Sequence, residues 1–359
     1  MVKNSKIYVA GHKGLVGSAI LKNLQKKGYT NLITKTHNEL DLINQKAVEK
    51  FFKEEKPEYV FLAAAKVGGI VANNTYRADF IYENLSIQNN IIYNAYKYNV
   101  KKLIFLGSTC IYPKNAPQPL KEEYLLTSEL EYTNEPYAIA KIAGIKMCES
   151  FNLQYETNFI SVMPTNLYGK NDNFDLEKSH VLPALIRKIH LAKALQEGNW
   201  NEIKKDLNKN PIEDISGNSN KNEIINILKK YGITKDRVEI WGSGKSKREF
   251  LYSDDMADAC IYLMENIDFK DIINYFNIKE IRNTHINIGT GKDLNIKELA
   301  YIIKSIIGFQ GEFYFDNSKP DGTLRKVTDI NRLQYLGWKY KTELDKGIEL
   351  VYHWYRGIF

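Results

Sequence analysis

Three side chains in this sequence form a pattern suited to acid–base chemistry at a carbonyl group. Tyr137 and Lys141 are four residues apart, so on a helix they share one face. The pKa of a phenol is about 10, and a neighbouring cation is expected to move it toward neutrality. Ser108 follows an apolar run and can supply the hydroxyl that orients a reacting carbonyl. The three residues therefore predict a reductase site in which Tyr137 donates the proton.

A glycine-rich segment near the N-terminus predicts a dinucleotide-binding loop. It follows the β-rich run 7–10 and opens a helical pattern. Glycines at this spacing allow a tight turn and a close approach of the backbone to a pyrophosphate, which then lies at a helix N-terminus. The position between a strand and a helix makes the pattern more specific than glycines alone. The cofactor-binding residues expected here are Gly11, His12, Lys13, Gly14, Leu15, Val16 and Gly17.

The end of the second predicted strand favours NADP(H) over NAD(H). An acidic residue there would hydrogen-bond the ribose diol of NAD and repel a 2′-phosphate. Residues 33–37 read Ile-Thr-Lys-Thr-His and contain no acid. Lys35 and Lys13 can pair with the extra phosphate of NADP, and Asp41 is expected near the adenine.

The elements that must position these residues alternate between strand and helix. Short β-rich runs lie at 7–10, 32–34, 59–63, 103–107 and 159–163, with helical patterns between them. This alternation predicts an α/β fold, a Rossmann-type doubly wound parallel sheet. The stretch 137–155 predicts one long helix that carries both Tyr137 and Lys141.

The pattern changes after residue 164, where loops become longer and strands more isolated. We expect an NADP-binding Rossmann domain over 1–165 and a mainly substrate-binding domain over 166–359, with segments that return to the first domain. The Asn- and Lys-rich segment 196–235 is interpreted as an insertion, either at the surface or as a lid or oligomer contact. Its apolar residues have helical spacing and predict an amphipathic helix. They are Ile224, Ile227, Leu228 and Tyr231.

Composition argues against several classes of protein. Of the 359 residues, 43% are hydrophobic and 26% charged, as in ordinary globular proteins. No apolar run approaches the roughly 18 residues of a membrane span, and the first strand begins too early for a signal peptide, so a cytoplasmic protein without a membrane partner is expected. The net charge is +7, but without a dense basic block no nucleic-acid partner is expected. Three scattered cysteines indicate neither disulfides nor a metal site.

Short strings along nearly the whole chain outside the insertion carry a resemblance to one family. They are 63–70 (AAAKVGGI), 107–113 (GSTCIYP), 134–144 (NEPYAIAKIAG), 163–169 (MPTNLYG), 179–184 (SHVLPA), 241–244 (WGSG), 248–251 (REFL) and 318–322 (SKPDG). With these strings the sequence resembles the GDP-L-fucose synthase family, which belongs to the extended short-chain dehydrogenases/reductases.

The resemblance implies 3,5-epimerisation and 4-reduction of GDP-4-keto-6-deoxy-D-mannose to GDP-L-fucose. The C4 ketone acidifies C3 and C5, and in the family a cysteine and a histidine act there as base and acid. The matching residues are Cys110 and His180. NADPH then reduces C4, Tyr137 donates the proton, and Lys141 supports the tyrosine and the nicotinamide ribose. The resemblance also implies a homodimer formed through the helix that contains Tyr137.

Basic side chains are expected to hold the GDP pyrophosphate, because arginine offers paired donors to phosphate. The candidates are Arg187, Lys188 and Arg248, with Lys319 added by the family match, and Asn166 and Trp241 as sugar or nucleotide contacts. Lys35 and Lys188 stand where the family has arginine. Lysine keeps the positive charge but lacks the planar fork.

Other functions stay open. The insertion lies next in sequence to the predicted substrate helix, so a GDP-4-keto-heptose or a similar GDP-linked keto sugar is an alternative substrate, and so is C4 reduction without epimerisation. A 4,6-dehydratase usually carries an acidic pair where residues 108–110 read Ser-Thr-Cys. A 4-epimerase fits the strings less well and would hold NAD tightly. A non-catalytic nucleotide-binding regulator would not need Ser108, Tyr137 and Lys141 together.

Overall fold

The computed structural model describes residues 1–276, 280–319 and 321–358. Its internal contacts divide the chain into two compact units. Unit 1 comprises Met1–Asn171, Glu249–Lys292 and Val327–Thr342, and unit 2 comprises Asp172–Arg248, Asp293–Lys326 and Glu343–Phe359. The chain therefore passes between the units several times.

Unit 1 is built on a parallel sheet whose strands, in the described residues, follow the order β2-β1-β3-β4-β5-β9. The strands are β1 (Ile7–Ala10), β2 (Leu32–Ile33), β3 (Tyr59–Leu62), β4 (Lys102–Leu106), β5 (Phe159–Pro164) and β9 (Ile286–Ile288). The register aligns Ile7 with Leu32 on one side and with Tyr59 on the other. Because all pairs are parallel, the carboxyl ends of the strands lie at one edge, where ligands bind in such sheets.

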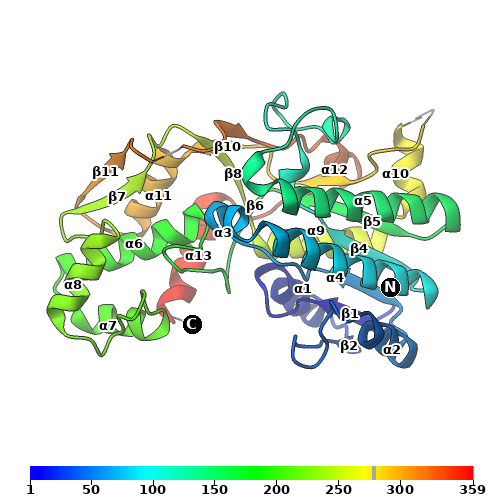
Figure 1. Ribbon diagram of the computed structural model, residues 1–359, viewed down its shortest axis with the longest axis horizontal. Coiled ribbons are helices and arrows are strands. Elements are labelled where there is room, and N and C mark those ends of the chain that lie inside the picture. The colour runs from blue at the N-terminus through cyan, green and yellow to red at the C-terminus, as the bar shows by residue number, and fades with distance from the viewer. Residues whose placement is uncertain (277–279, 320, 359) are drawn as a thin grey trace. The chain divides into compact units, whose positions relative to one another are not determined.

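Helices cover both faces of this sheet, and α4 and α5 lie side by side on one of them (Figure 1). The helices are α1 (Leu15–Lys26), α2 (Gln45–Glu55), α3 (Ile70–Thr75), α4 (Arg77–Lys97), α5 (Glu135–Tyr155), α9 (Ser253–Asn266), α10 (Phe269–Phe276) and α12 (Asn331–Tyr335). Successive strand residues point to opposite faces. Ile104 therefore packs with α1 and α9, whereas Leu103 and Phe105 pack with α2, α4 and α5. This arrangement confirms the predicted doubly wound α/β fold.

Two short strands and a buried acid hold the returning segments of unit 1. Strand β6 (Asn166–Tyr168) pairs in parallel with β8 (Lys247–Tyr252). The fully buried Glu249 accepts hydrogen bonds from the backbone N–H groups of Gly291, at 2.7 Å, and Thr328, at 2.8 Å. Burial raises the pKa of Glu249, and these hydrogen bonds oppose the rise. One carboxyl group thus fastens two loops from distant parts of the sequence.

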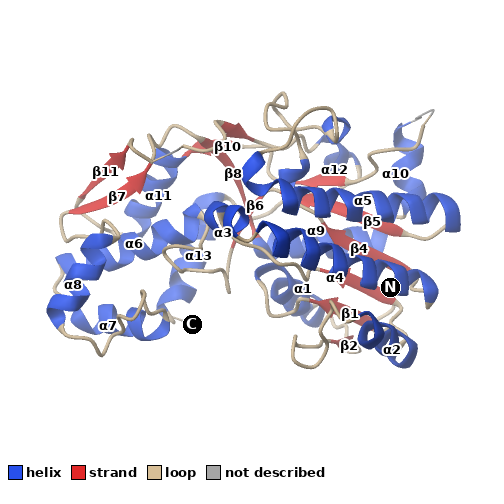
Figure 2. Ribbon diagram, in the orientation of Figure 1, coloured by secondary structure: helices blue, strands red, loops and turns tan. Residues whose placement is uncertain are grey.

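Unit 2 combines helices with a parallel pair of strands, β7 and β11, which run side by side in Figure 2. Its elements are α6 (Val181–Gln196), α7 (Trp200–Lys209), α8 (Lys221–Lys230), β7 (Arg237–Trp241), β10 (Asp293–Asn295), α11 (Ile296–Ile307), β11 (Glu312–Asp316), β12 (Arg325–Lys326) and α13 (Leu344–Arg356). The register places Trp241, the last residue of β7, beside Asp316.

The segment 196–235 folds into capped helices. Asn199 caps α7 by accepting from the backbone of Glu202 at 3.2 Å. Asn220 and Glu223 form a capping box at the start of α8, which satisfies two backbone N–H groups that a helix start would otherwise leave unpaired. The predicted amphipathic helix is confirmed, since its apolar residues at 224, 227 and 228 are buried.

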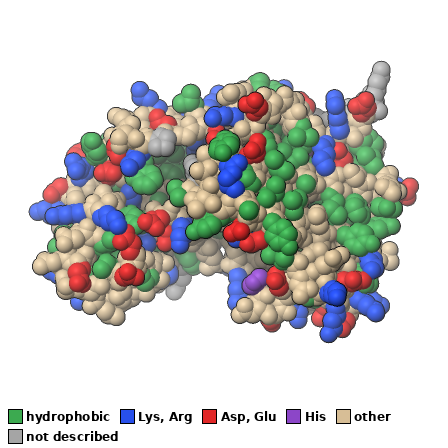
Figure 3. All heavy atoms as spheres, in the orientation of Figure 1, with side chains coloured by type: hydrophobic (Ala, Val, Ile, Leu, Met, Phe, Trp, Pro, Cys, Tyr) green, Lys and Arg blue, Asp and Glu red, His purple; other side chains and the backbone are tan. Residues whose placement is uncertain are grey.

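The next features concern the hydrophobicity of the described helices and the charges on the surface. In the part of the chain that the structure describes, no helix is both long enough and apolar enough to cross a bilayer. On the face drawn in Figure 3, basic and acidic side chains are interspersed. The positive net charge therefore does not gather into a basic patch on that face.

Candidate active site

The glycine loop has steric reasons for its composition. Gly11 has φ +84°, a conformation that glycine adopts without strain. A Cβ atom on Gly17 would lie 2.1 Å from the Gly11 carbonyl oxygen. Gly14 precedes α1, and no described side chain caps this helix start. The first N–H groups of α1 thus suit an anion, and the loop fits the pyrophosphate of a dinucleotide.

His12 adds a buried polar atom to this loop. Its Nδ1 atom has no hydrogen-bond partner among the described residues. Desolvation, followed by the charge of Lys13, lowers the pKa of His12, while Glu39 opposes the shift. The ring is therefore neutral near pH 7, and Nδ1 is an unused donor or acceptor beside the predicted cofactor site.

Lys13, Lys35 and Glu39 form a charged cluster beside the glycine loop. Glu39 accepts a hydrogen bond from the backbone N–H of Thr36 at 2.7 Å. Hydrogen bonding by the Thr36 side chain, then this backbone bond, and then the charges of Lys35 and Lys13 lower the pKa of Glu39. Sequence reasoning missed Glu39 because its approach to Lys13 depends on the loop between β2 and α2. Asp41 accepts from the backbone of Ile43 at 3.0 Å, and its contact with adenine remains a prediction.

The end of β4 carries Ser108 and Cys110 in one tight turn. The hydroxyl of Ser108 accepts from the backbone N–H of Cys110 at 3.3 Å and so caps a 3-10 turn, Thr109–Ile111. Cys110 is 9% exposed. The turn brings a hydroxyl and a thiol together at the carboxyl edge of the sheet.

Lys141 reaches the same strand end from α5. Its ammonium donates to the carbonyl oxygen of Leu106 at 2.7 Å and lies 5.7 Å from the centre of the Tyr137 ring. Burial lowers the pKa of Lys141 to about 8, and the negative charge of Cys110 opposes this. Leu106 is a functional contact that no sequence signal could reveal, because its backbone carbonyl is what matters.

The structure corrects the expected pKa of Tyr137. Burial, followed by the charge of Cys110, raises this pKa instead of lowering it. The ring packs edge-on against Phe80, with centroids 6.3 Å apart, so the phenolate would lose much of its hydration. Tyr137 is therefore a protonated phenol in this state, which suits a proton donor.

In unit 2, His180 stands immediately before α6. Its backbone carbonyl accepts from the N–H of Ala184 at 3.1 Å, and its side chain is exposed. Partial desolvation by surrounding protein, and then the charge of Lys326, lower the pKa of His180. The imidazole is therefore neutral near pH 7 and able to accept a proton.

Lys188 and Arg187 are neighbours on α6, but their environments differ. The Lys188 ammonium is half-buried and donates to the carbonyl oxygen of Glu239 at 3.1 Å. Desolvation lowers its pKa to about 8, and the Glu239 charge opposes this. A poorly hydrated ammonium of this kind gains from pairing with a phosphate.

The prediction that Arg187 contacts GDP is wrong. Its side chain is 0% exposed and paired with the Asp206 carboxylate at 3.0 Å. Within the same guanidinium group, Nη1 donates to the carbonyl oxygen of Phe174 at 3.2 Å and Nη2 donates to that of Asn210. With its donors committed inside unit 2, Arg187 is a structural residue.

Trp241 and Lys319 form an exposed pair at the end of β7. The indole is 59% exposed, and the Lys319 ammonium lies 5.6 Å from its ring centre. An exposed flat ring suits stacking against a planar base or sugar. The Arg248 guanidinium donates to the carbonyl oxygens of Thr323, at 2.5 Å, and Lys247, at 2.8 Å, and both bonds come from the single nitrogen Nη1.

Asp321 was not predicted, although it lies in the string 318–322. Its carboxylate accepts from the backbone N–H of Ser243 at 2.7 Å and from the Ser243 hydroxyl at 2.8 Å. Gly242 has φ +81°, and a Cβ there would lie 2.4 Å from Asp321. Asp321 therefore shapes the loop that follows Trp241. Pro320 of the same string lies outside the described residues.

Two further features carry less chemistry. The amide nitrogen of Asn166, in unit 1, donates to the Glu249 carbonyl oxygen at 2.8 Å, and a contact of Asn166 with sugar remains a prediction.

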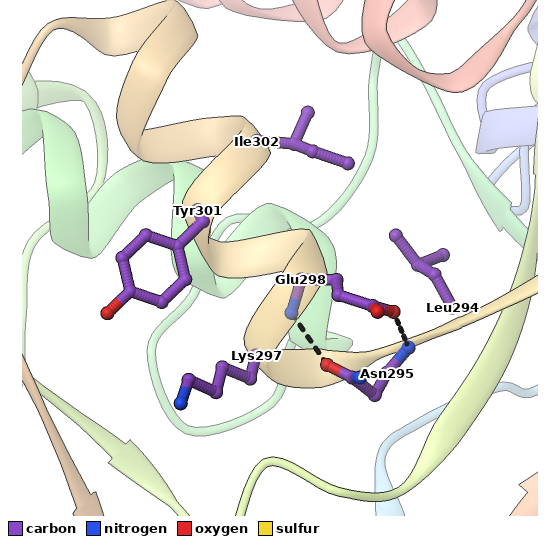
Figure 4. Close-up of a pocket in the computed structure, with 6 residues that line it drawn as sticks. All are labelled: Leu294, Asn295, Lys297, Glu298, Tyr301 and Ile302. Atoms are coloured by element: carbon purple, nitrogen blue, oxygen red, sulfur yellow. Dashed lines mark hydrogen bonds between the residues drawn. The ribbon is translucent and has the colours of Figure 1, made fainter.

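In unit 2, Figure 4 shows an open hollow beside α11. Its polar side chains Asn295 and Glu298 are already used in capping that helix. The hollow is lined by Leu294, Asn295, Lys297, Glu298, Tyr301 and Ile302. Within the described ranges, no group of acidic, histidine or cysteine side chains is arranged to hold a metal ion.

Comparisons with known proteins cover nearly the whole chain. The model of the NAD dependent epimerase/dehydratase family matches residues 7–207 and 216–289. GDP-L-fucose synthase 1 from Arabidopsis thaliana is 50% identical over 98% of this chain and 94% of its own. The structure of a GDP-6-OMe-4-keto-L-xylo-heptose reductase from C. jejuni is 55% identical, covers 99% of both chains and has a TM-score of 0.92. That of a GDP-mannoheptose C4 reductase from Campylobacter jejuni with NADP bound is 54% identical, covers 99% of both chains and has a TM-score of 0.87.

Lys141→Met is expected to change how stability depends on pH. The folded-state pKa of Lys141, about 8, lies below its ordinary value of 10.5. Between these values the unfolded chain binds more protons, so wild-type stability rises with pH. The methionine variant lacks this gain, and its free energy of unfolding relative to wild type should fall by about 1–3 kcal/mol across the window. Urea unfolding at pH 7.5 to 10.5 measures the difference. The exposed Lys50→Met is the control, and a flat difference for Lys141→Met would contradict the depressed pKa.

Proposed function

Because this chain belongs to the NAD dependent epimerase/dehydratase family, and within it to the GDP-L-fucose synthase relatives, we propose that it converts GDP-4-keto-6-deoxy-D-mannose to GDP-L-fucose with NADPH. The observation that carries the proposal is in unit 1. Cys110 shares a turn with Ser108, whose hydroxyl accepts from the Cys110 backbone N–H at 3.3 Å, and the Lys141 ammonium reaches the same strand end at the Leu106 carbonyl oxygen, at 2.7 Å. A thiol able to move carbon-bound protons therefore lies at the same strand end as groups that serve the reduction.

Residues of unit 1 are assigned to NADP. The loop of Gly11, Gly14 and Gly17 holds the pyrophosphate, and Lys13 and Lys35 pair with the 2′-phosphate. Both lysines lower the pKa of Glu39, so the two cations act on one region, in which a 2′-phosphate would compete with the Glu39 carboxylate for them. When bound, the cofactor supplies the reducing equivalents for C4.

Proton transfer at the C4 oxygen is assigned to Tyr137. Burial keeps its phenol protonated, so it donates as negative charge develops on the oxygen. The Lys141 ammonium, held by the Leu106 carbonyl, favours the phenolate that remains. The Ser108 hydroxyl orients the carbonyl.

Proton transfers at C3 and C5 are assigned to Cys110 and His180. The adjacent ketone makes these carbons acidic, so a thiolate or a neutral imidazole can remove a proton and a partner of the other kind can return one to the opposite face. Lowering of the His180 pKa leaves its imidazole neutral and able to act as a base. Neither residue is needed for reduction alone.

The GDP moiety is assigned to residues of unit 2, with Asn166 of unit 1 contacting the sugar. Lys188 pairs with the pyrophosphate, because its ammonium is desolvated and held by one carbonyl. Trp241 stacks on a planar part of the substrate, with Lys319 and Arg248 supplying further positive charge near it.

The test of this function is the mass of the product made with NADPH in heavy water. Wild type is expected to add two solvent deuterons on carbon, one each at C3 and C5. Cys110→Ser should abolish carbon deuteration, because serine is a far weaker acid than cysteine. Cys148→Ser, at a second buried cysteine, is the matched control and should keep both deuterons. Reduction without carbon deuteration by wild type would leave a C4 reductase and remove the roles of Cys110 and His180.

A second candidate function is C4 reduction of a GDP-linked keto-heptose. It is supported by the two Campylobacter jejuni reductases, whose names state heptose substrates and which are similar to this chain over 99% of its length. The residues assigned to proton donation at C4 would serve either sugar. Oxidation of NADPH with a GDP-4-keto-heptose, but not with the deoxymannose substrate, would favour this candidate.

Lys35→Glu is expected to weaken the use of NADPH and leave that of NADH almost unchanged. A carboxylate beside the 2′-phosphate would repel it, and the ratio of kcat/KM for NADPH over NADH should fall about 10–100-fold, equivalent to roughly 1.4–2.8 kcal/mol. Steady-state kinetics with both cofactors measures the ratio. Lys46→Glu, at an exposed position on α2, controls for net charge. An unchanged ratio in Lys35→Glu would show that Lys35 does not contact the phosphate.

We also propose a homodimer formed through α4 and α5. These two helices pack against each other and expose apolar side chains, an arrangement typical of interaction surfaces. The side chains are Tyr82, Tyr93, Ile139, Leu153 and Tyr155. Sedimentation should give twice the chain mass of 41.5 kDa, and Leu153→Glu should shift the mass toward one chain because it would bury a charge. Sedimentation of the wild type as a single chain at micromolar concentration would contradict the proposal.

A further inference from the structure

The segment 196–235 reaches helix α6 through a buried ion pair. Asp206, on α7, accepts from the Arg187 Nε atom at 3.0 Å. The two side chains are 0% and 3% exposed. The hydroxyl of Tyr355, on α13, donates to the second oxygen of Asp206. Asp206 is thus the point at which α6, α7 and α13 meet.

A buried ion pair such as that of Arg187 and Asp206 does not by itself add much to the free energy of unfolding. Removal of two charges from water costs several kcal/mol per ion, and the attraction between them often only offsets that cost. The geometry, however, is tightly defined. Arg187 is a planar fork with its donors divided among Asp206 and the carbonyl oxygens of Phe174 and Asn210. A rotation or shift of α6 would break several of these bonds at once, so the pair holds the helix in one orientation.

Lys188 depends on that orientation because it is the next residue along α6. Consecutive side chains on an α-helix are about 100° apart. When Arg187 points toward α7, Lys188 therefore points elsewhere, and its ammonium meets the Glu239 carbonyl oxygen on β7 at 3.1 Å. Loss of the Arg187 anchor would let α6 rotate and carry the Lys188 ammonium away from its place.

We propose that Asp206 is a positioning residue for GDP binding, which it serves by holding Arg187 and thereby α6 and Lys188. The proposal rests on the proposed function, in which Lys188 pairs with the GDP pyrophosphate. The family model leaves residues 208–215 unmatched, and Asn210, an acceptor for Arg187, lies in that gap. Asp206 itself lies in the part of the chain that the family model matches.

The test compares Asp206→Asn with Leu207→Ala. The first change keeps the size of the side chain and removes its charge. The second removes a fully buried neighbour on the same helix and leaves the ion pair intact. Asp206→Asn should raise KM for the GDP-keto sugar about tenfold with kcat within about twofold, the pattern of lost ground-state binding. Leu207→Ala should lower the melting temperature and leave KM within about twofold of wild type.

Calorimetric titration with GDP alone supplies a readout that does not need turnover. Asp206→Asn should weaken GDP binding about tenfold, which corresponds to 1.4 kcal/mol, and Leu207→Ala should not. If Asp206→Asn does not fold, Tyr355→Phe removes one hydrogen bond to Asp206 and should weaken GDP binding in the same direction, by less.

The outcomes separate the two proposals. Equal effects of Asp206→Asn and Leu207→Ala on KM and on GDP affinity, or no effect of Asp206→Asn, would overturn the positioning role. A wild type that binds GDP but turns over neither sugar, with the difference between the variants preserved, would overturn the proposed reaction and support the positioning role. A wild type that does not bind GDP would overturn both.

Discussion

The hydrogen bond from the Lys141 ammonium to the Leu106 carbonyl ties helix α5 to the carboxyl end of strand β4. A buried ammonium is costly unless it is paired or hydrogen-bonded, so this carbonyl restricts where α5 can lie. Tyr137 stands one helical turn before Lys141, and Ser108 and Cys110 follow Leu106 closely in the chain. One contact between a side chain and the backbone therefore brings the hydroxyl, the thiol, the phenol and the ammonium to a single edge of the sheet. The chemistry of unit 1 depends on it.

The cost of burying an unpaired charge also explains why two adjacent cations in unit 2 have different partners. Arg187 is fully buried and paired with Asp206, whereas Lys188 is half-buried and held by one carbonyl. The guanidinium has several donors in a fixed plane, so it suits a position that must hold several partners at once. The ammonium is a compact charge that gains from a phosphate when it is poorly hydrated. In the proposed function, Arg187 therefore supports α6 and its neighbour Lys188 binds the phosphate.

Burial explains why the chemistry of individual side chains differed from the expectations based on spacing. The spacing of Tyr137 and Lys141 suggested a lowered phenol pKa, but desolvation dominates and raises it. Positive charge and neighbouring motifs suggested a phosphate contact for Arg187, but its partner Asp206 lies on a different helix, 19 residues further along the chain, and was not foreseeable. Glu39 and Asp321 escaped notice because each acts on residues that the folded chain, and not the local pattern, brings near. Burial and long-range pairing are properties of the packed structure, and a motif does not carry them.

Local patterns were sufficient for the elements of the fold and for the identity of the reacting groups. Strand residues must alternate faces and glycines must stand where a Cβ would collide, so the doubly wound sheet and the dinucleotide loop are visible in the order of residues. The helix that carries Tyr137 and Lys141 follows from its unbroken pattern in the same way. Packing decided which charged side chains are exposed and which are buried with hydrogen-bond partners, as Arg187 and Glu249 are. The reason is physical: periodicity depends on neighbours in the chain, whereas desolvation and ion pairing depend on neighbours in space.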